Sequence, residues 1–236
     1  MEQFSRTTAI LGREGLDKLQ KSSVAIFGLG GVGSYAVESL ARCGVGDLIL
    51  VDNDIVDVTN VNRQIIALHS TLGQAKVDVA KARVLDINPK TNVVTHKVFY
   101  TKDSAADVIE GCDYVVDAID TVSSKLALVQ ACKQKKIPII SCMGTGNKLE
   151  PTMFEVADIF CTSVCPLCRV MRHELRKIGI DSLKVVYSKE VPIRSDNGLR
   201  CCNSDSSVPG SVPFVPPVAG LIVASEVVKD IILARI

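Results

Sequence analysis

The sequence predicts an α/β protein with a Rossmann-like, doubly wound and mainly parallel sheet, together with a smaller C-terminal lobe. The short apolar run 23–27 stops at a glycine cluster, as a buried parallel strand does where it turns into a helix. Short apolar runs and segments of helical periodicity then alternate up to residue 145, and the pattern loosens beyond it. We therefore expect the Rossmann-like domain over residues 1–145 and the lobe, continuous with it, over 146–236.

The first strand is followed at once by the signals of a helix and a second strand. Helical spacing covers 34–42, and the apolar run 47–51 ends at Asp52. A second helix is expected from 77 to 87, where Asn88-Pro89 closes it. The remaining expected elements of this domain are strands at 93–98, 114–117 and 137–141 and a helix at 123–135. Those of the lobe are a helix at 166–178, a strand at 183–188, a polar loop at 195–210 and a closing helix from 218 to 232.

The composition is that of an ordinary globular protein without a dominant charge. Of the 236 residues, 47% are hydrophobic and 22% are charged, and the net charge is +1. No global field attracts nucleic acid or an anionic membrane, so any RNA contact must come from a local patch. The N-terminus lacks the order of a secretory signal, and the apolar stretch 212–224 is short and proline-rich, so we expect no membrane span and a cytoplasmic location. The nine cysteines lack a disulfide-framework spacing and are expected to be free thiols.

The glycine cluster after the first strand predicts a nucleotide-binding loop. Its members are Gly28, Gly30, Gly31 and Gly33. Glycines let the backbone approach a phosphate closely, and the N-terminus of the following helix supplies aligned N–H groups. Asp52 follows the last glycine by 19 residues, where an acid can hold ribose hydroxyls. The alternative is a glycine turn that merely packs tightly, with Asp52 as a solvated strand end.

The segment after Asp52 favours a triphosphate over a dinucleotide. Asn60, Arg63 and Gln64 lie in a polar loop, and Lys76 opens the next helix. Each of these side chains alone is typical of a protein surface, but together they surround one glycine loop and suit phosphate oxygens.

Asp120 is the candidate metal ligand. It follows the strand at 114–117, at the carboxyl edge of the predicted sheet. A carboxylate facing ATP would be repelled unless a divalent cation lay between them, so we expect Asp120 to bind Mg²⁺. The alternative is that Asp120 caps the helix that follows.

Six short stretches resemble the ThiF, MoeB and HesA family, the bacterial relatives of ubiquitin-activating enzymes. They are Gly28-Leu-Gly-Gly-Val-Gly33, Leu50-Val-Asp-Asn-Asp54, Asn60-Val-Asn-Arg-Gln64, Gly73-Gln-Ala-Lys76, Ile87-Asn-Pro89 and Asp117-Ala-Ile-Asp120. The resemblance implies an adenylation fold, ATP and Mg²⁺ as cofactors, release of pyrophosphate and a homodimer. It also implies that Asp54 joins the nucleotide site, and that Arg6 reaches the ATP of the partner subunit. The catalytic set implied in this way is Arg6, Arg63, Lys76 and Asp120.

Later stretches narrow the resemblance to the subfamily that dehydrates threonylcarbamoyladenosine in tRNA. They are Thr162-Ser-Val-Cys-Pro-Leu, Arg169-Val-Met-Arg172 and Pro209-Gly-Ser-Val-Pro-Phe-Val-Pro-Pro-Val-Ala-Gly220. The resemblance implies that the threonyl carboxylate of the modified adenosine is adenylated, and that the ureido group then closes a ring and expels AMP. The polar loop at 195–210, with Arg194 and Arg200, is expected either to cover this pocket and meet RNA or to be an ordinary solvated loop.

The cysteines mark where the resemblance weakens. Some family members carry a cysteine before the last helix, where this chain has Asp205 with Cys201 and Cys202 close by, so a thioester step is optional. Carrier activators of the family bind zinc with two Cys-x-x-Cys pairs, of which only Cys165-Pro-Leu-Cys168 is present. Adjacent Cys201 and Cys202 would strain a four-sulfur site. Activation of a ubiquitin-like sulfur carrier, with a sulfur-relay partner, and a nucleotide-sensing scaffold remain the alternative functions.

Overall fold

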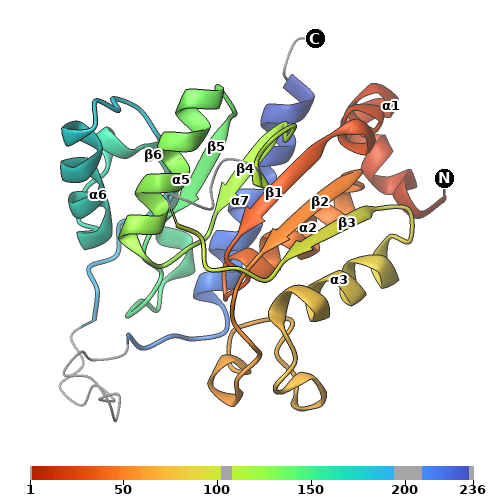
Figure 1. Ribbon diagram of the computed structural model, residues 1–236, viewed down its shortest axis with the longest axis horizontal. Helices are drawn as coiled ribbons and strands as arrows, with labels where there is room; N and C mark the ends of the chain where they lie inside the picture. The colour runs from red at the N-terminus through yellow and green to blue at the C-terminus, as the bar shows by residue number, and fades with distance from the viewer. Residues whose placement is uncertain (1, 102–107, 194–208, 234–236) are drawn as a thin grey trace.

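The computed structural model describes residues 2–101, 108–193 and 209–233, which form a sheet with helices on both of its faces (Figure 1). The strands are β1 (Ser23–Phe27), β2 (Asp47–Val51), β3 (Asn92–His96), β4 (Tyr114–Asp117), β5 (Ile139–Cys142), β6 (Phe154–Asp158) and β7 (Lys184–Ser188). The α-helices in these residues are α1 (Ser5–Lys21), α2 (Gly33–Cys43), α3 (Lys76–Ile87), α5 (Val122–Lys135), α6 (Pro166–Lys177) and α7 (Val215–Leu233). Every helix and strand expected from the sequence outside the polar loop is present, with ends that shift by a few residues.

The sheet has the order β3-β2-β1-β4-β5-β7-β6. All neighbouring strands are parallel except β6 and β7, which pair antiparallel. The order reverses next to β1, so the loops after β1 and β4 diverge at the carboxyl edge, which is where ligands of such sheets bind. The predicted α/β fold with a mainly parallel sheet is confirmed.

The two helical layers follow from the alternation of side chains along the strands. Val24 and Ile26 of β1 pack in a core with α2, α3 and α7, whereas Ala25 and Phe27 pack in a second core with α5 and α6. Because successive strand residues point to opposite faces, a strand covered on both faces is apolar throughout. This explains why β1 is an unbroken apolar run.

Two elements lie outside the sequence expectations. Helix α1 precedes the first strand and is interrupted at Gly12, whose φ of 74° is not helical. Strand β6 forms the antiparallel edge of the sheet and is only half-buried for most of its length. An edge strand with partial burial lacks the continuous apolar run that is typical of strands buried on both faces.

The C-terminal part of the chain is built into the same architecture. β6 and β7 extend the sheet, and α7 lies against the start of α2 (Figure 1). The helices approach closely because residue 220 is glycine: a Cβ there would lie 2.3 Å from the carbonyl oxygen of Val32. The division at residue 145 stays a prediction. Within the described ranges, no helix combines the length and apolar character that a membrane crossing requires, and the seven cysteines they contain are free thiols.

Candidate nucleotide site

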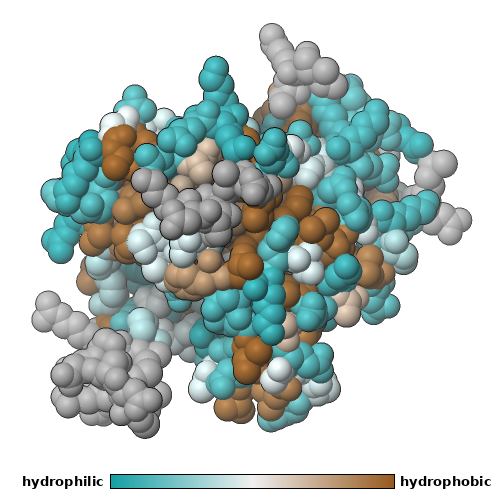
Figure 2. Space-filling model, viewed as in Figure 1, coloured by the Kyte–Doolittle hydropathy of each residue, from teal (hydrophilic) through white to brown (hydrophobic). Residues whose placement is uncertain are grey.

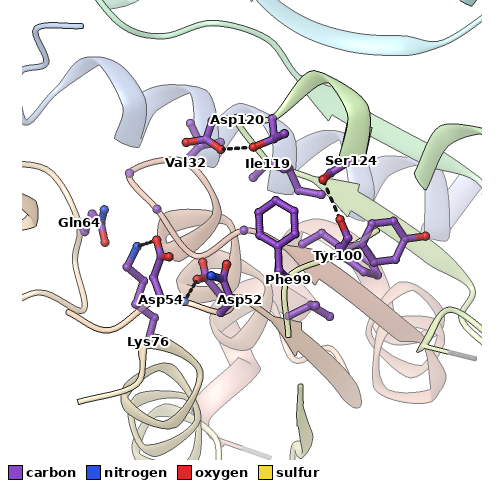
Figure 3. A pocket seen from close by; sticks show the side chains of 18 of the residues that line it. Val32, Asp52, Asp54, Gln64, Lys76, Phe99, Tyr100, Ile119, Asp120 and Ser124 are labelled. Atoms are coloured by element: carbon purple, nitrogen blue, oxygen red, sulfur yellow. Dashed lines mark hydrogen bonds and ion pairs between the residues drawn. The ribbon is translucent and has the colours of Figure 1, made fainter. Parts of the chain in front are cut away.

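A pocket of about 400 Å³ lies at the carboxyl edge of the sheet (Figure 3). Its walls come from the loops that follow β1, β2 and β4 and from the first residue of α3. Most of the residues predicted for the site line this pocket, namely Gly28, Gly30, Gly31, Asp52, Asp54, Asn60, Arg63, Lys76 and Asp120. Residues that are far apart in the sequence are therefore brought together where a nucleotide was expected.

Gly28 and Gly33 shape the loop by permitting close backbone packing. Gly28 has a φ of +87°, and a Cβ there would lie 2.6 Å from the carbonyl oxygen of Ala118. A Cβ on Gly33 would lie 1.7 Å from the carbonyl oxygen of Gly28. Gly33 begins α2 and does not line the pocket, so its contribution to the site is to set the turn that presents the loop.

Gly30 differs from these glycines because the space beside it is open. The nearest atom to a Cβ there is the amide nitrogen of Gln64 at 3.9 Å. Gly31, in contrast, faces the Cβ of Pro216 at 2.9 Å, so the start of α7 closes over the loop. A ligand can therefore approach the backbone most closely at Gly30.

Asp52 ties two loops together with its carboxylate. Oδ2 accepts a hydrogen bond from the N–H of Leu29 at 2.6 Å, and Oδ1 accepts one from the N–H of Asp54 at 2.8 Å. Burial raises the pKa of Asp52, and these hydrogen bonds only partly offset that effect. A carboxylate has about four acceptor positions, so Asp52 can also accept hydroxyl hydrogens from a ligand in the pocket.

Lys76 is the most buried charged side chain of the pocket. It is 4% exposed, and its Nζ donates to Asp54 Oδ2 at 2.8 Å (Figure 3). The backbone adds to this link, since the N–H of Lys76 donates to the carbonyl of Asp54 at 3.0 Å. The ammonium group is therefore held in one position at the start of α3.

Arg63 is held by uncharged acceptors. Its Nη1 donates to the carbonyl of Thr59 at 2.8 Å and to Asn62 Oδ1 at 3.0 Å. Asn60 stabilises the same turn by accepting from the N–H of Asp57 at 3.2 Å. Arg63 forms no ion pair with any residue that the structure describes, so its charge is not neutralised within that part of the protein.

Asp120 lies at the exposed rim of the pocket (Figure 3). Its Oδ1 accepts from the hydroxyl of Thr121 at 3.2 Å. Thr121 is the N-cap position of α5, and no side chain makes a capping hydrogen bond there. The alternative that Asp120 caps this helix is therefore wrong.

The loop that carries Asp120 rests on a buried ion pair. Lys125 and Asp117 are both fully buried, with Nζ and Oδ2 separated by 2.9 Å. The other oxygen of Asp117 accepts from the N–H of Ile119 at 3.1 Å. Breaking a buried pair leaves an uncompensated charge, so this link holds residues 118–121 in place.

Several pocket residues were not predicted. Phe99 and Tyr100 follow β3 and form an aromatic wall, and Phe99 is 53% exposed. Gln64, which was expected among the polar side chains around the glycine loop, does line the pocket, but its burial was not expected, and its Oε1 has no hydrogen-bond partner within the described residues. The sequence signal for the aromatic wall was the pair Phe99-Tyr100 directly after the expected strand. The burial of Gln64, in contrast, depends on tertiary packing.

The other residues that the sequence analysis singled out do not line this pocket or lie outside the described residues. Arg6 is exposed on α1 and does not line the pocket. Arg194, Arg200, Cys201, Cys202 and Asp205, with most of the 195–210 loop, lie outside the described residues.

The fold and the pocket define a Rossmann-like nucleotide-binding protein, with a glycine loop and an acid after the second strand. The chain belongs to the ThiF family, whose model matches residues 4–234. The resemblance predicted from the sequence motifs is confirmed.

The chain is similar over nearly its whole length to dehydratases that act on tRNA. The Bacillus subtilis tRNA threonylcarbamoyladenosine dehydratase is 47% identical over 242 residues, which cover 98% of this chain and 95% of that protein. The Escherichia coli protein of the same name is 35% identical, covering 89% of this chain and 81% of its own length. The crystal structure of the E. coli enzyme TcdA in complex with ATP has a TM-score of 0.89 and 33% identity, covering 98% of this chain and 93% of that one.

Proposed function

We propose that this protein is an ATP-dependent dehydratase of tRNA threonylcarbamoyladenosine. It adenylates the threonyl carboxylate, and the ureido group then closes a ring and expels AMP. The proposal rests on the glycine loop, Asp52, Arg63 and Lys76, which lie around one pocket. The chain is also similar over nearly its whole length to such dehydratases.

The pocket fits ATP in three respects. The open space at Gly30 admits a phosphate next to the backbone. Asp52 retains acceptor positions for ribose hydroxyls, and the unpaired Oε1 of Gln64 is a buried acceptor that lacks a donor. Phe99 offers an exposed aromatic face to the base.

Mg²⁺ suits the acidic rim of the same pocket. The exposed carboxylate of Asp120 and the outer oxygen of Asp54 are hard oxygen donors of the kind that Mg²⁺ prefers. The ion would neutralise charge on the phosphates. Asp120 is the residue that we assign to hold it.

In the proposed adenylation and ring closure, the protein positions the reacting groups and supplies positive charge near the phosphates. Lys76 and Arg63 stabilise the negative charge that develops on the phosphates during attack by the carboxylate. Ring closure within the acyl-adenylate gains from the effective molarity of an attached nucleophile. The pocket must exclude water, because hydrolysis of the acyl-adenylate returns the starting acid. No covalent cysteine intermediate is required.

A homodimer completes the site in our proposal, with Arg6 reaching the ATP of the partner subunit. Four large apolar side chains between β2 and α3 are exposed, namely Ile55, Val58, Leu68 and Leu72. Figure 2 shows hydrophobic surface at the tips of these loops. Clustered exposed apolar side chains favour a protein interface, which supports association of two copies.

From the proposed substrate we infer a cytoplasmic location and contact with tRNA. A sulfur-relay protein is a further partner in the alternative function, the activation of a ubiquitin-like sulfur carrier. A Culex quinquefasciatus protein named adenylyltransferase and sulfurtransferase MOCS3 is 38% identical, but the match covers only 59% of this chain and 32% of that protein. This partial match favours the dehydratase.

The test is reconstitution with purified protein, ATP, Mg²⁺ and tRNA that carries threonylcarbamoyladenosine. After mild digestion, mass spectrometry should find the nucleoside lighter by one water, with AMP and pyrophosphate released. If AMP forms with a ubiquitin-like carrier while the nucleoside mass never changes, the carrier-activating alternative is correct.

A further inference from the structure

Cys165 and Cys168 form a pair of buried thiols at the start of α6, outside the nucleotide pocket. Cys165 is the N-cap residue, Pro166 is the first helical residue, and Cys168 follows one turn later. Residues three apart lie on the same face of a helix. Cys165 is 3% exposed and Cys168 is fully buried.

The sulfur of Cys165 is surrounded by hydrogen-bond donors. The thiol of Cys168 donates to it, and so do the backbone N–H groups of Cys168, Gly144 and Leu167. These bonds lower the pKa of Cys165 although burial opposes them, and the bond to Cys165 raises the pKa of Cys168. Cys165 therefore lies among hydrogen-bond donors at the start of α6, and the thiol of Cys168 is one of them.

A buried cation lies close to the pair. Lys148 is 4% exposed, and its Nζ donates to the carbonyl of Glu190 at 2.6 Å. Burial lowers the pKa of Lys148, and the nearby charge of Cys165 opposes this effect. Helix N-termini and neighbouring cations are the environments that activate a cysteine in Cys-x-x-Cys pairs.

We propose that Cys165 and Cys168 are a redox-active dithiol that a hydroperoxide converts reversibly into an intrachain disulfide. Gly144 directly precedes Thr145, which lines the nucleotide pocket, so the dithiol is adjacent to that pocket without belonging to it. A small oxidant suits a sulfur of such low exposure.

The chemistry balances with hydrogen peroxide as the oxidant. The thiolate of Cys165 attacks one peroxide oxygen, an S–O bond forms, the O–O bond breaks, and the leaving hydroxide takes a proton to become water. Cys168 then attacks the sulfenic sulfur of Cys165, an S–S bond forms, the S–O bond breaks and a second water leaves. Two thiols are oxidised by two electrons in total, and one peroxide is reduced to two waters.

Metal binding is the competing use of these thiols. A structural zinc needs four ligands, and the described residues contain no group of three or more His, Cys, Asp or Glu side chains placed to hold a metal. Within the described part of the chain, the pair therefore stands as a dithiol.

The experiment compares oxidation rates of individual cysteines in the full-length reduced protein. After a brief pulse of hydrogen peroxide, peptide mass mapping should find Cys165 linked to Cys168, and dithiothreitol should reverse the link. Cys161 is exposed and Cys132 is buried with a raised pKa. Because reactivity follows thiolate content, Cys165 should react at least about 10-fold faster than either, despite its burial.

Two variants separate the steps, in a Cys201→Ser/Cys202→Ser background that removes other partners. In Cys168→Ser, a dimedone adduct should accumulate on Cys165, whereas Cys165→Ser should leave Cys168 unmodified. ATP binding checks that each variant is folded. Oxidation of Cys165 no faster than that of Cys161 would overturn the proposal. So would stoichiometric zinc in the purified protein that is lost in Cys165→Ser.

Discussion

Lys76 illustrates how single side chains carry the proposed chemistry. Its ammonium group is buried and tied to Asp54, so its charge is fixed in place before any ligand binds. Charge that is preorganised in this way stabilises a transition state without reorganisation at the moment of reaction.

Replacement of Lys76 by alanine should slow adenylation by about 100-fold or more, since one charge contact to the transition state is lost. The measurement is ATP–pyrophosphate exchange in the presence of modified tRNA. Lys81→Ala is the matched control, because Lys81 lies on the same helix but does not line the pocket. Near wild-type turnover by a folded Lys76→Ala protein would remove Lys76 from the mechanism.

The sequence predicted the charged residues of the pocket better than its apolar wall. Asp52, Lys76 and Asp120 stand at the ends or starts of elements whose periodicity is visible, so their convergence follows from the fold. Phe99 and Gln64 line the pocket because of how two loops pack. The aromatic pair at the end of a strand hinted at this wall, whereas the burial of Gln64 depends on tertiary packing that local patterns do not show.

At the scale of elements, the unit formed by β1, the glycine loop and α2 presents the backbone to the nucleotide. The glycines of this loop differ in the space that is available for a side chain. Gly33 has no room for a side chain, whereas Gly30 has room that a ligand would fill.

Alanine at these two glycines should therefore give opposite results. Gly33→Ala forces a Cβ against the carbonyl of Gly28 and should lower the free energy of unfolding by about 1–3 kcal/mol. Gly30→Ala should keep its stability but bind ATP more weakly. Urea unfolding and calorimetry distinguish the two, and equal ATP affinity of Gly30→Ala and wild type would refute a phosphate at Gly30.

Helix α2 is tied to α3 by Glu38. Its carboxylate pairs with Arg83 Nε at 2.6 Å and with Arg42 Nη2 at 2.7 Å. Burial raises the pKa of Glu38, but the hydrogen bonds from Arg83 and Arg42 outweigh it, so the pKa lies below the ordinary 4.5. The stabilisation is therefore complete above pH 4.5 and is lost as the pH falls through the lower pKa of the folded state.

Glu38→Gln should lower the free energy of unfolding by about 1.5 kcal/mol at neutral pH, the size of one charge-assisted hydrogen bond. The difference from wild type should shrink below the folded-state pKa, which urea titrations at neutral and acidic pH can measure. Glu14→Gln is the control, since Glu14 is 86% exposed and exposed pairs contribute little. A difference that is independent of pH would contradict the assigned ion pairs.

The elements that the sequence did not predict have weak local signals. α1 is broken at Gly12, and β6 is a half-buried antiparallel edge strand. Five of the strands that were predicted correctly, β1, β2, β4, β5 and β7, have neighbours on both sides in the sheet and are largely buried, and such burial leaves a clear apolar run in the sequence. β3 is an edge strand as well, with alternating burial, and it was nevertheless predicted.

At the scale of the whole molecule, the account requires two copies of the chain. Arg6 does not line the pocket of its own chain, so its proposed role depends on a partner subunit. The whole-molecule net charge of +1 supplies no general attraction to RNA, so the proposed tRNA substrate would have to be recognised by a local surface.

Hybrid dimers test the shared site. Arg6→Ala and Lys76→Ala proteins should each be nearly inactive, and a mixture that has exchanged subunits should regain partial activity, because one of the two pockets in a hybrid dimer has both residues. Product formation before and after mixing is the measurement. A protein that is monomeric by light scattering, or a mixture that stays inactive after proven exchange, would refute completion in trans.

The most direct test of the central claim follows the oxygen of the threonyl carboxylate. With modified tRNA labelled with ¹⁸O in that carboxylate, attack on the α-phosphorus of ATP transfers one labelled oxygen to AMP when the ring closes. We expect AMP that contains one ¹⁸O for each nucleoside that loses water. Unlabelled AMP, or ADP and phosphate as the products, would show that the carboxylate is not adenylated and would contradict the account.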